Sequence, residues 1–280
     1  MSSVTAVGVF VVGMHRSGTS TLVRMFEAAG FHAGTEDDFN PPTDHDPDGH
    51  REHRALWATN EAILAYIGRS WDDPVGIDWA ALDPAERADV LGAINAALPA
   101  FTHTEPWVAK DPRLCLTLSL WAERVPAAAV FIHRDPLEVA DSLHARDGRP
   151  LASGIALWEA YVRSALRALP LIPHTFVGFA PLVADPTAEL GALLERLDLH
   201  APRQPPISAP FTAARVRHRR SPEETAAHLN PSQRQLLTAV ELLVAGHPEA
   251  SDAQEAAMAA PMSAAAAELS AVPGRQLRLR

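Results

Sequence analysis

The stretch VGVFVVGMHRSGTST, residues 7–21, decides the fold of this chain. Its first part, Val7–Val12, is an uninterrupted apolar run of the kind that forms a strand buried on both faces of a sheet. The glycine-containing segment Gly13–Gly18 follows, and strand, glycine loop and helix in this order direct backbone N–H groups at a phosphate. The expected helix is indicated by an apolar stripe formed by Leu22, Met25, Phe26 and Ala29.

The glycine loop differs from the common phosphate loop G-x-x-x-x-G-K-[ST] at one decisive position. Gly13 and Gly18 match its two glycines, but Thr19 stands where the lysine belongs. That lysine normally reaches the β- and γ-phosphates of ATP or GTP. Because Arg16 supplies positive charge from inside the loop instead, we expect a 5′-phosphate that carries a different transferring group. A glycine turn without any ligand is the alternative.

Strand-like runs recur along the chain and alternate with helical patterns. After the first strand they are Trp107–Ala109, Ala128–His133 and Thr175–Phe179. Such alternation indicates crossover connections and a mostly parallel sheet, whose ligands bind at the carboxyl ends of the strands. We therefore predict an α/β fold, a P-loop-type three-layer sandwich with helices on both faces of the sheet.

The composition of the chain changes toward its C-terminus. We predict one P-loop domain over residues 1–246. From His247 the chain is rich in alanine and poorly periodic, so residues 247–280 are expected to form a loosely packed or disordered tail. Within the domain, Thr35–Arg54 is rich in Asp, His, Pro and Gly, which predicts a long polar loop beside the ligand crevice.

Charge and composition exclude several classes of protein. The 280 residues carry a formal net charge of −10, which argues against a general nucleic-acid binder. The single cysteine, Cys115, excludes a disulfide framework and a four-cysteine zinc site, and it is expected in the core. No apolar run reaches the roughly 18 residues of a membrane span and no export signal is recognised, so we expect a cytoplasmic protein. The oligomeric state is left open.

Two of the predicted strands end in the same way. Lys110-Asp111-Pro112 follows one strand and Arg134-Asp135-Pro136 follows another. In both, the aspartate is predicted to cap the next helix with a proline in its first turn, and Glu138 is predicted to complete a capping box with Asp135. We therefore assign no chemistry to Asp111 or Asp135.

The basic residues that precede these aspartates are expected to face the same crevice as the glycine loop. Lys110 and Arg134 both fall at the carboxyl end of a strand. Ser142 and Arg146 share one face of the helix that Arg134 precedes. Arg134, Ser142 and Arg146 are therefore candidates for a second anion site, with an ordinary solvated helix face as the alternative for Arg146.

These motifs together resemble those of the sulfotransferase family, whose donor is 3′-phosphoadenosine 5′-phosphosulfate (PAPS). Gly13–Thr21 resembles the 5′-phosphosulfate loop of that family. Arg134 followed by Ser142 resembles its 3′-phosphate motif, and Lys110-Asp111-Pro112 resembles the Lys-Asp-Pro of the tyrosylprotein branch. The resemblance runs from about residue 9 to residue 186. It implies donor-binding roles for His15, Arg16, Ser17, Gly18, Thr19, Ser20, Thr21, Arg134, Ser142 and Arg146.

The same resemblance implies how the reaction is catalysed. Arg16 and Lys110 are expected to stabilise charge that builds on the bridging oxygen. The catalytic histidine of the cytosolic branch has no counterpart, because Asp111-Pro112 occupies its place. The preferred general base is Glu52, in a segment similar to Asn-Pro-x-Gly-Tyr-Phe-Glu of related bacterial sulfotransferases. The second candidate is Glu36, placed like the glutamate base of the tyrosylprotein branch; a simple ion pair with arginine is the structural alternative for Glu52.

Two further expectations concern the 3′-phosphate and metals. Sulfotransferases commonly bring a late arginine to the 3′-phosphate, and here the basic segment 215–220 offers Arg217 or Arg219. The histidines and aspartates of residues 45–53 do not follow a metal-binding pattern, and the reaction requires no metal, so we expect none.

We thus expect a PAPS-dependent sulfotransferase that acts by in-line displacement. The acceptor is expected to be a hydroxyl or amine of a small molecule, carbohydrate or lipid, and adenosine 3′,5′-bisphosphate (PAP) is the product of the donor. A P-loop small-molecule or nucleotide kinase is one alternative, although the missing loop lysine argues against it. A non-catalytic nucleotide-binding scaffold is the other.

Overall fold

The computed structural model describes residues 8–41, 49–102, 106–203, 219–267 and 269. At its centre lie four strands, which form a sheet in the order β2-β1-β3-β4. Every neighbouring pair is parallel, so the carboxyl ends of all four strands lie at one edge of the sheet. The strands are β1 (Gly8–Val12), β2 (Trp107–Lys110), β3 (Ala127–His133) and β4 (His174–Gly178).

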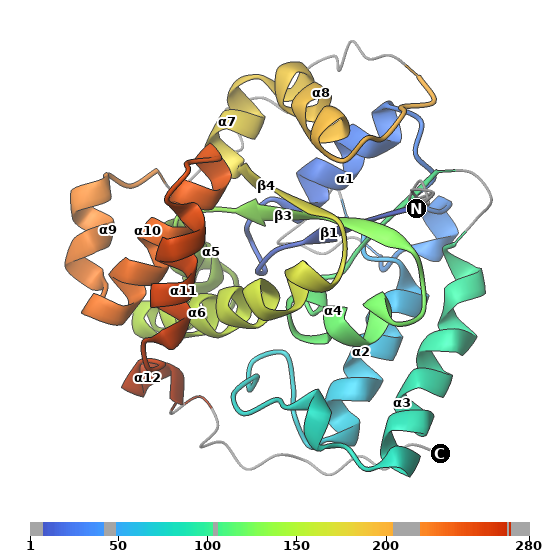
Figure 1. Ribbon diagram of the computed structural model, residues 1–280, viewed down its shortest axis with the longest axis horizontal. Helices are drawn as coiled ribbons and strands as arrows, with labels where there is room; N and C mark the ends of the chain where they lie inside the picture. Colours follow the sequence, from blue (N-terminus) through green and yellow to red (C-terminus); the bar gives the residue numbers. More distant parts are fainter. Residues whose placement is uncertain (1–7, 42–48, 103–105, 204–218, 268, 270–280) are drawn as a thin grey trace.

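Helices cover both faces of this sheet (Figure 1). On one face lie α1 (Thr19–Ala28) and α8 (Pro186–Arg196), and on the other lie α4 (Leu114–Ala122) and α6 (Leu151–Ala168). The α/β fold with a parallel sheet between two helical layers, expected from the alternating pattern, is therefore confirmed.

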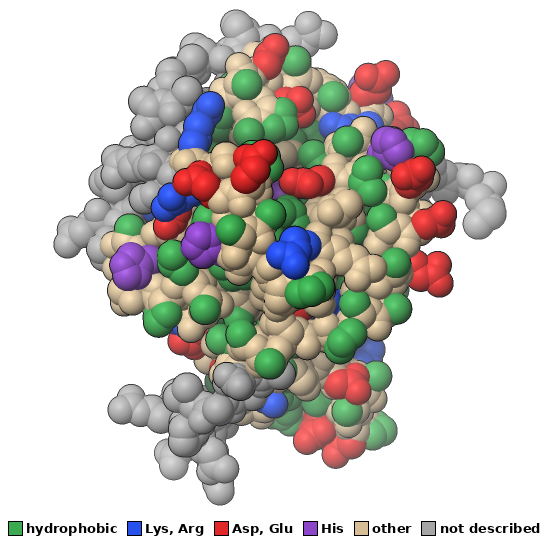
Figure 2. Space-filling model, turned by 90° about the vertical axis from the view of Figure 1, so that its left-hand side faces the viewer, with side chains coloured by type: hydrophobic (Ala, Val, Ile, Leu, Met, Phe, Trp, Pro, Cys, Tyr) green, Lys and Arg blue, Asp and Glu red, His purple; other side chains and the backbone are tan. Residues whose placement is uncertain are grey.

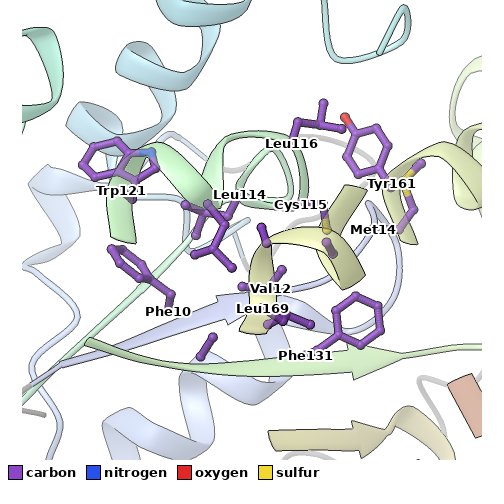
Figure 3. Close-up of a cluster of buried hydrophobic side chains, with 14 of the residues drawn as sticks. Phe10, Val12, Met14, Leu114, Cys115, Leu116, Trp121, Phe131, Tyr161 and Leu169 are labelled. Carbon is purple, nitrogen blue, oxygen red and sulfur yellow. The ribbon is translucent and has the colours of Figure 1, made fainter. Parts of the chain in front are cut away.

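The pleat of β1 divides the hydrophobic core between these two layers. Val9 and Val11 pack with residues of α1 and α8, whereas Phe10 and Val12 pack with residues of α4 and α6. Figure 3 shows the second group, in which Phe10 lies near Trp121 of α4. All four β1 side chains are fully buried, as the uninterrupted apolar run predicts.

The remaining helices extend these layers or lie beside them. Several begin where an Asp, Ser or Asn side chain accepts a backbone N–H and a proline fills the first turn, as at Asp83, Asp185, Ser221 and Asn230. These helices are α2 (Arg54–Tyr66), α3 (Pro84–Ala97), α5 (Pro136–Asp147), α7 (Phe179–Ala184), α9 (Pro222–His228), α10 (Pro231–Ala245), α11 (Ala250–Ala259) and α12 (Ala264–Ala267).

The Asp-Pro sequence after β3 caps a helix as predicted. Asp135 Oδ1 accepts hydrogen bonds from the N–H groups of Leu137 (2.8 Å) and Glu138 (3.0 Å), in the first turn of α5. The predicted capping box is wrong, because the Glu138 carboxylate does not turn back to Asp135. It pairs instead with Arg134, whose Nε lies 2.9 Å from Glu138 Oε2. The buried Arg134 guanidinium needs such a negatively charged partner.

Two other predicted boundaries are also corrected. Asp111 does not cap α4, which begins at Leu114 with Arg113 at its N-cap position. Asp111 is fully buried. It accepts the N–H of the nearby Arg113 over 2.8 Å and also a hydrogen bond from the side chain of the distant Asn60. The fourth strand ends at Gly178, and Phe179, which was expected in that strand, begins α7.

The tail that was expected to be loose is packed in its described part. Arg163 of α6 is buried and donates to the carbonyl oxygens of Ala257 (2.8 Å) and Ala260 (3.2 Å). Glu159 pairs with Arg163 over 3.1 Å and accepts the N–H of Ser263 over 3.0 Å. The alanine-rich sequence gives little sign of this packing, because it is made by backbone carbonyl oxygens and by small buried side chains such as Ala257. Residues 270–280 lie outside the described part.

Three further observations concern the charges on the surface, the apolarity of the helices and the single cysteine. On the side where α9 lies in Figure 1, acidic and basic side chains are interspersed (Figure 2). Among the described helices, none is both long enough and apolar enough to cross a membrane. Cys115 is fully buried in the core, as expected, and burial raises the pKa of its thiol.

Candidate active site

A cleft of about 350 Å³ opens at the carboxyl ends of β1, β2 and β3. This is the edge at which a parallel sheet with helices on both faces binds its ligands. The lining comes from the glycine loop, the segment around His50, the residues that follow β2 and β3, and parts of the surrounding helices. The lining residues are His15, Arg16, Gly18, Thr19, Ser20, Thr21, Arg24, Gly49, His50, Glu52, Trp71, Lys110, Pro112, Arg113, Arg134, Arg146 and Phe179.

The loop between β1 and α1 requires glycine at two positions. Gly18 has a left-handed φ of 92°, and a Cβ there would lie 2.3 Å from the ring of Phe179. A Cβ on Gly13 would lie 2.9 Å from the carbonyl oxygen of Ile132. Because Gly18 is also the N-cap residue of α1 and brings no capping side chain, the N–H groups of the first helical turn are left for a ligand.

The loop is fixed to the core through Met14. Its side chain is buried and lies in the cluster that also contains Cys115 and Tyr161 (Figure 3). The N–H of Ser17 donates to the carbonyl oxygen of Met14 over 3.1 Å, and within this turn Arg16 adopts a left-handed φ of 69°. That conformation is unfavourable for a residue with a Cβ, so the contacts of Arg16 must hold it in place.

Arg16 connects the glycine loop to the helix that follows β3. Its Nε donates to Ser142 Oγ on α5 over 2.9 Å. Its carbonyl oxygen accepts a hydrogen bond from Arg134 Nη1 over 3.0 Å. The structure therefore brings together the two anion sites that the sequence suggested, and Ser142 lies directly behind the Arg16 side chain.

Arg134 is a buried cation with hydrogen-bonding capacity left for a ligand. Its Nε and Nη1 bind Glu138 and the Arg16 carbonyl oxygen, and its guanidinium carbon lies 4.8 Å from the ring centroid of Phe179. Nη2 is buried and has no hydrogen-bond partner among the described residues. Since a buried N–H without a partner is costly, an anionic oxygen at this place would be stabilising.

Lys110 and Glu52 form an ion pair at the end of β2. Lys110 Nζ lies 3.1 Å from Glu52 Oε1 and also donates to the carbonyl oxygen of His50. Burial by itself favours the neutral acid, but the positive charges of Lys110 and Arg113 hold the pKa of Glu52 below its ordinary value. Glu52 is therefore an anion at neutral pH and is able to accept a proton.

The segment that carries Glu52 is held against α1 by its backbone. Ser20 Oγ donates to the carbonyl oxygen of His50 over 2.8 Å, and Arg24 Nη2 donates to that of Gly49 over 3.3 Å. Lys110 shares the same His50 oxygen. The Ser20 hydroxyl thus connects the glycine loop to the Lys110–Glu52 pair in this structure, in addition to lining the cleft.

Glu36, the second candidate for the base, is not brought to the cleft. It lies in a single 3-10 turn, its side chain is 83% exposed, and it pairs with Arg51 Nη1 over 2.7 Å. Arg51 holds this position with a left-handed φ of 51°. The geometry favours Glu52 over Glu36, because only Glu52 lines the cleft beside Lys110.

Arg146 reaches the cleft from α5 through an aromatic partner. Its guanidinium carbon lies 5.0 Å from the ring centroid of Trp71, and Nη2 lies 2.7 Å from Asp147 Oδ2. Arg149 stacks on the same ring at 5.1 Å. Trp71 therefore lines the cleft together with arginines that come from a distant part of the chain.

The late arginines are placed only in part. Arg219 is exposed and lines a neighbouring cavity of about 450 Å³, which shares Arg134 and Phe179 with the cleft. Arg217 lies outside the described residues, as do residues 42–48 with their histidine and aspartates. Within the described ranges, no group of three or more His, Cys, Asp or Glu side chains is arranged to hold a metal ion.

A buried polar network behind the Lys-Asp-Pro motif was not predicted. Arg113 lines the cleft; its Nη1 lies 3.2 Å from Asp111 Oδ2 and its Nε pairs with Glu61. Asn60 donates to Asp111 over 3.3 Å and accepts from Thr117 over 2.8 Å. Burial raises the pKa of Asp111 to about 6, against the opposing charge of Arg113. The network fixes the Arg113 guanidinium at the cleft.

His15 contributes a neutral ring rather than a charge. The ring centroid lies 4.9 Å from that of Trp71 and 5.7 Å from that of Tyr161. Burial, reinforced by the charges of Arg113, Arg146 and Lys110, holds the pKa of His15 well below its ordinary value. Its Nε2 is buried and has no hydrogen-bond partner in the described part of the chain.

No curated protein matches this chain. Solved structures that are similar include the sulfotransferase domain from the curacin biosynthetic pathway, with 18% identity over 94% of this chain and 95% of that chain and a TM-score of 0.43. Sulfotransferase STF9 from Mycobacterium avium has 16% identity over 81% and 69%, with a TM-score of 0.42. The sulfotransferase domain from the Synechococcus PCC 7002 olefin synthase has 19% identity over 94% and 92%, with a TM-score of 0.41.

The family model of sulfotransferases matches residues 8–203. This range extends from β1 to beyond α8 and includes the glycine loop, Lys110 and Arg134, the residues that meet at the cleft. The match covers well over half of the chain, and the chain therefore belongs to the sulfotransferase family.

Proposed function

We propose that this chain transfers a sulfonyl group from PAPS to a hydroxyl or amine of a small-molecule, carbohydrate or lipid acceptor and releases PAP. The observation that carries the proposal is the meeting of three features in one cleft. These are the glycine loop after β1, the Lys110–Glu52 pair at the end of β2, and Arg134 after β3, whose Nη2 has no partner within the described part of the chain. The family supplies the type of reaction, and the cleft supports the choice of donor.

The cleft suits a donor that carries anionic groups at two separate positions. Gly18, Thr19 and Ser20 lie where the glycine loop passes into α1, and their backbone N–H groups hold the 5′-phosphosulfate. The buried Nη2 of Arg134 fits an oxygen of the 3′-phosphate. Ser142 supports this site indirectly, because it accepts from the Arg16 side chain and the Arg16 carbonyl oxygen accepts from Arg134. Arg146 adds positive charge from the Trp71 side of the cleft. The exposed Arg219 lies close enough to Arg134 to extend this site through the neighbouring cavity.

The proposed reaction is an in-line displacement at sulfur. The acceptor oxygen forms a bond to sulfur while the bond between sulfur and the bridging oxygen of the donor breaks, and that oxygen leaves with PAP. Arg16 and Lys110 stabilise the negative charge that builds on the bridging oxygen. Glu52 takes the proton of the acceptor hydroxyl.

The ion pair between Lys110 and Glu52 links these two events. In the resting structure the carboxylate holds the ammonium group at 3.1 Å. When Glu52 gains the acceptor proton it loses its charge, so Lys110 no longer has to balance it. The lysine is then free to stabilise the leaving oxygen at the moment when its negative charge develops.

The experiment that tests this function is a thermal-shift titration of the whole chain with PAP and, separately, with ATP and magnesium. A ligand present at 100 times its Kd adds roughly 2.7 kcal/mol, which raises the melting temperature by several degrees. We expect a clear rise with PAP and little with ATP and magnesium, because Thr19 replaces the lysine that a triphosphate needs. A rise only with ATP and magnesium would identify a kinase and contradict the proposal.

A further inference from the structure

The order of the strands divides the cleft into two sides. β1 and β3 supply the glycine loop and Arg134, where the donor is proposed to bind, and β2 lies on the far side of β1 from β3. The groups that follow β2, together with His15 and Glu52, form what we call the acceptor wall, consisting of His15, Glu52, Lys110 and Arg113. An acceptor that approaches the sulfonyl group from outside the donor site meets this wall.

Both cations of the acceptor wall already have carboxylate partners within the protein. Lys110 Nζ lies 3.1 Å from Glu52 Oε1. Arg113 Nη1 lies 3.2 Å from Asp111 Oδ2, and its Nε pairs with Glu61. Three carboxylates thus balance the two cations of the wall. Arg146, whose charge also acts on His15, has its own carboxylate partner in Asp147 at 2.7 Å, so each of these three cations is already paired within the protein.

The wall nevertheless has hydrogen-bonding groups without protein partners. Arg113 Nη2 has no hydrogen-bond partner among the described residues, and His15 Nε2 is buried without one. The His15 ring is neutral at pH 7, because burial holds its pKa well below the ordinary value. Uncharged hydroxyl groups suit both, since a hydroxyl accepts from an N–H and donates to a ring nitrogen.

We propose that the acceptor is an uncharged molecule that presents, beside the reacting hydroxyl, further hydroxyl groups to Arg113 and His15. This inference rests on the proposed function and narrows its acceptor to neutral polyhydroxy compounds such as glycosides. A carboxylate or phosphate at the same place would lie close to Asp111 and Glu61 and would be repelled. Arg113 is then a residue that determines acceptor specificity.

The test uses acceptors in matched pairs that differ only by a carboxylate. Suitable pairs are octyl glucoside with octyl glucuronide, and hexanediol with hydroxyhexanoate. The wild-type chain is supplied with PAPS and the release of PAP is measured for each compound. We expect kcat/KM to be at least about tenfold higher for the uncharged member of a pair. Equal or faster reaction of the carboxylated member overturns the inference, and so does a protein that binds PAP and uses neither pair.

A variant tests whether the carboxylates of the network cause the selectivity. Glu61→Gln removes one negative charge beside Arg113, and we expect it to reduce the preference for the uncharged acceptor several-fold. Glu123 forms a similar ion pair with Arg87, outside the cleft, so Glu123→Gln is the matched control and should keep the wild-type preference. An unchanged preference in Glu61→Gln overturns the role of the network. Failure to bind PAP would instead contradict the proposed function, which separates the two outcomes.

Discussion

The segments Lys110-Asp111-Pro112 and Arg134-Asp135-Pro136 have the same charge pattern and leave strands of the same sheet, yet their surroundings differ. Asp135 serves its own helix: it accepts N–H groups of the first turn of α5, and Thr225 donates to its other oxygen over 2.7 Å. Asp111 does not cap the helix that follows it; it is fully buried and binds the guanidinium of Arg113 and the amide of the distant Asn60.

The basic residues of the two segments differ in a corresponding way. Arg134 keeps a buried nitrogen without a partner among the described residues, which suits it to bind an anion of fixed charge. Lys110 is bonded to Glu52 and to a backbone oxygen, which suits it to a site where charge changes during the reaction. Under the proposed function, the same motif therefore builds a binding site in one place and a catalytic site in the other.

The largest effect is expected for Lys110→Ala. Loss of one preorganised group that stabilises developing charge lowers kcat on the order of 10²- to 10³-fold. PAP affinity should change by less than about threefold, because Lys110 acts on the reacting end of the donor. PAP release at saturating donor and calorimetry with PAP measure the two quantities. Turnover close to that of the wild type would show that the β2 segment is not catalytic.

Because Asp111 is buried, the free energy of unfolding of the protein is expected to depend on pH. Burial raises the pKa of this group to about 6, whereas an aspartate of an unfolded chain titrates near 3.9. Between these values the folded state binds the proton more tightly, so the stability of the wild type falls relative to Asp111→Asn as the pH rises from about 4 to about 6. The change is about 1.4 kcal/mol for each unit between the two pKa values.

Urea unfolding of the wild type and Asp111→Asn at several pH values between about 4 and 7 measures this difference. Above the folded-state pKa the difference should become constant, since the carboxyl is then ionised in both states. A difference that stays level across the whole range would contradict the buried position of Asp111.

Arg134→Ala tests the binding role of the β3 segment. A charge-assisted hydrogen bond contributes roughly 1.5–3 kcal/mol, so PAP should bind about 10- to 100-fold more weakly. Calorimetric titration measures the affinity. Arg124, exposed beyond the end of α4, provides the control Arg124→Ala, which should bind PAP like the wild type. Equal losses in the two variants would indicate a general effect of charge and not a site at Arg134.

The smallest effect is expected for Asp135→Ala. Removal of a helix N-cap costs about 1 kcal/mol, within a usual range of roughly 0.5–2. Urea unfolding at neutral pH measures the loss, and unfolding of the wild type in the same buffer is the reference. A loss several times larger would mean that Asp135, like Asp111, is a centre of tertiary contacts.

The parts of the molecule that could be predicted from the sequence are those whose contacts are made by neighbouring residues of the chain. The strand and loop of residues 7–21 were predicted because an apolar run and two sterically required glycines are local signals. The cap at Asp135 was predicted for the same reason, since its partners are the next residues of the chain. The meeting of Lys110 and Arg134 at one cleft followed from the rule that parallel strands place their carboxyl ends together.

The features that were missed all depend on partners far away in the chain. Asp111 is bound by Asn60, which α2 brings to it, and the stacking of Arg146 and Arg149 on Trp71 joins segments that are far apart in the sequence. The described tail packs because Arg163 binds its carbonyl oxygens, which no side-chain pattern announces. Tertiary contacts of this kind override local propensity, so single-sequence patterns do not contain them.

The most direct test of the central claim, that this cleft is built for a nucleotide with a 3′-phosphate, is a calorimetric comparison of PAP with 5′-AMP on the wild-type chain. The two ligands differ only in the phosphate that Arg134 is proposed to bind. We predict that PAP binds at least about tenfold more tightly, which corresponds to roughly 1.4 kcal/mol or more for that group. Equal affinities for PAP and 5′-AMP would contradict the claim.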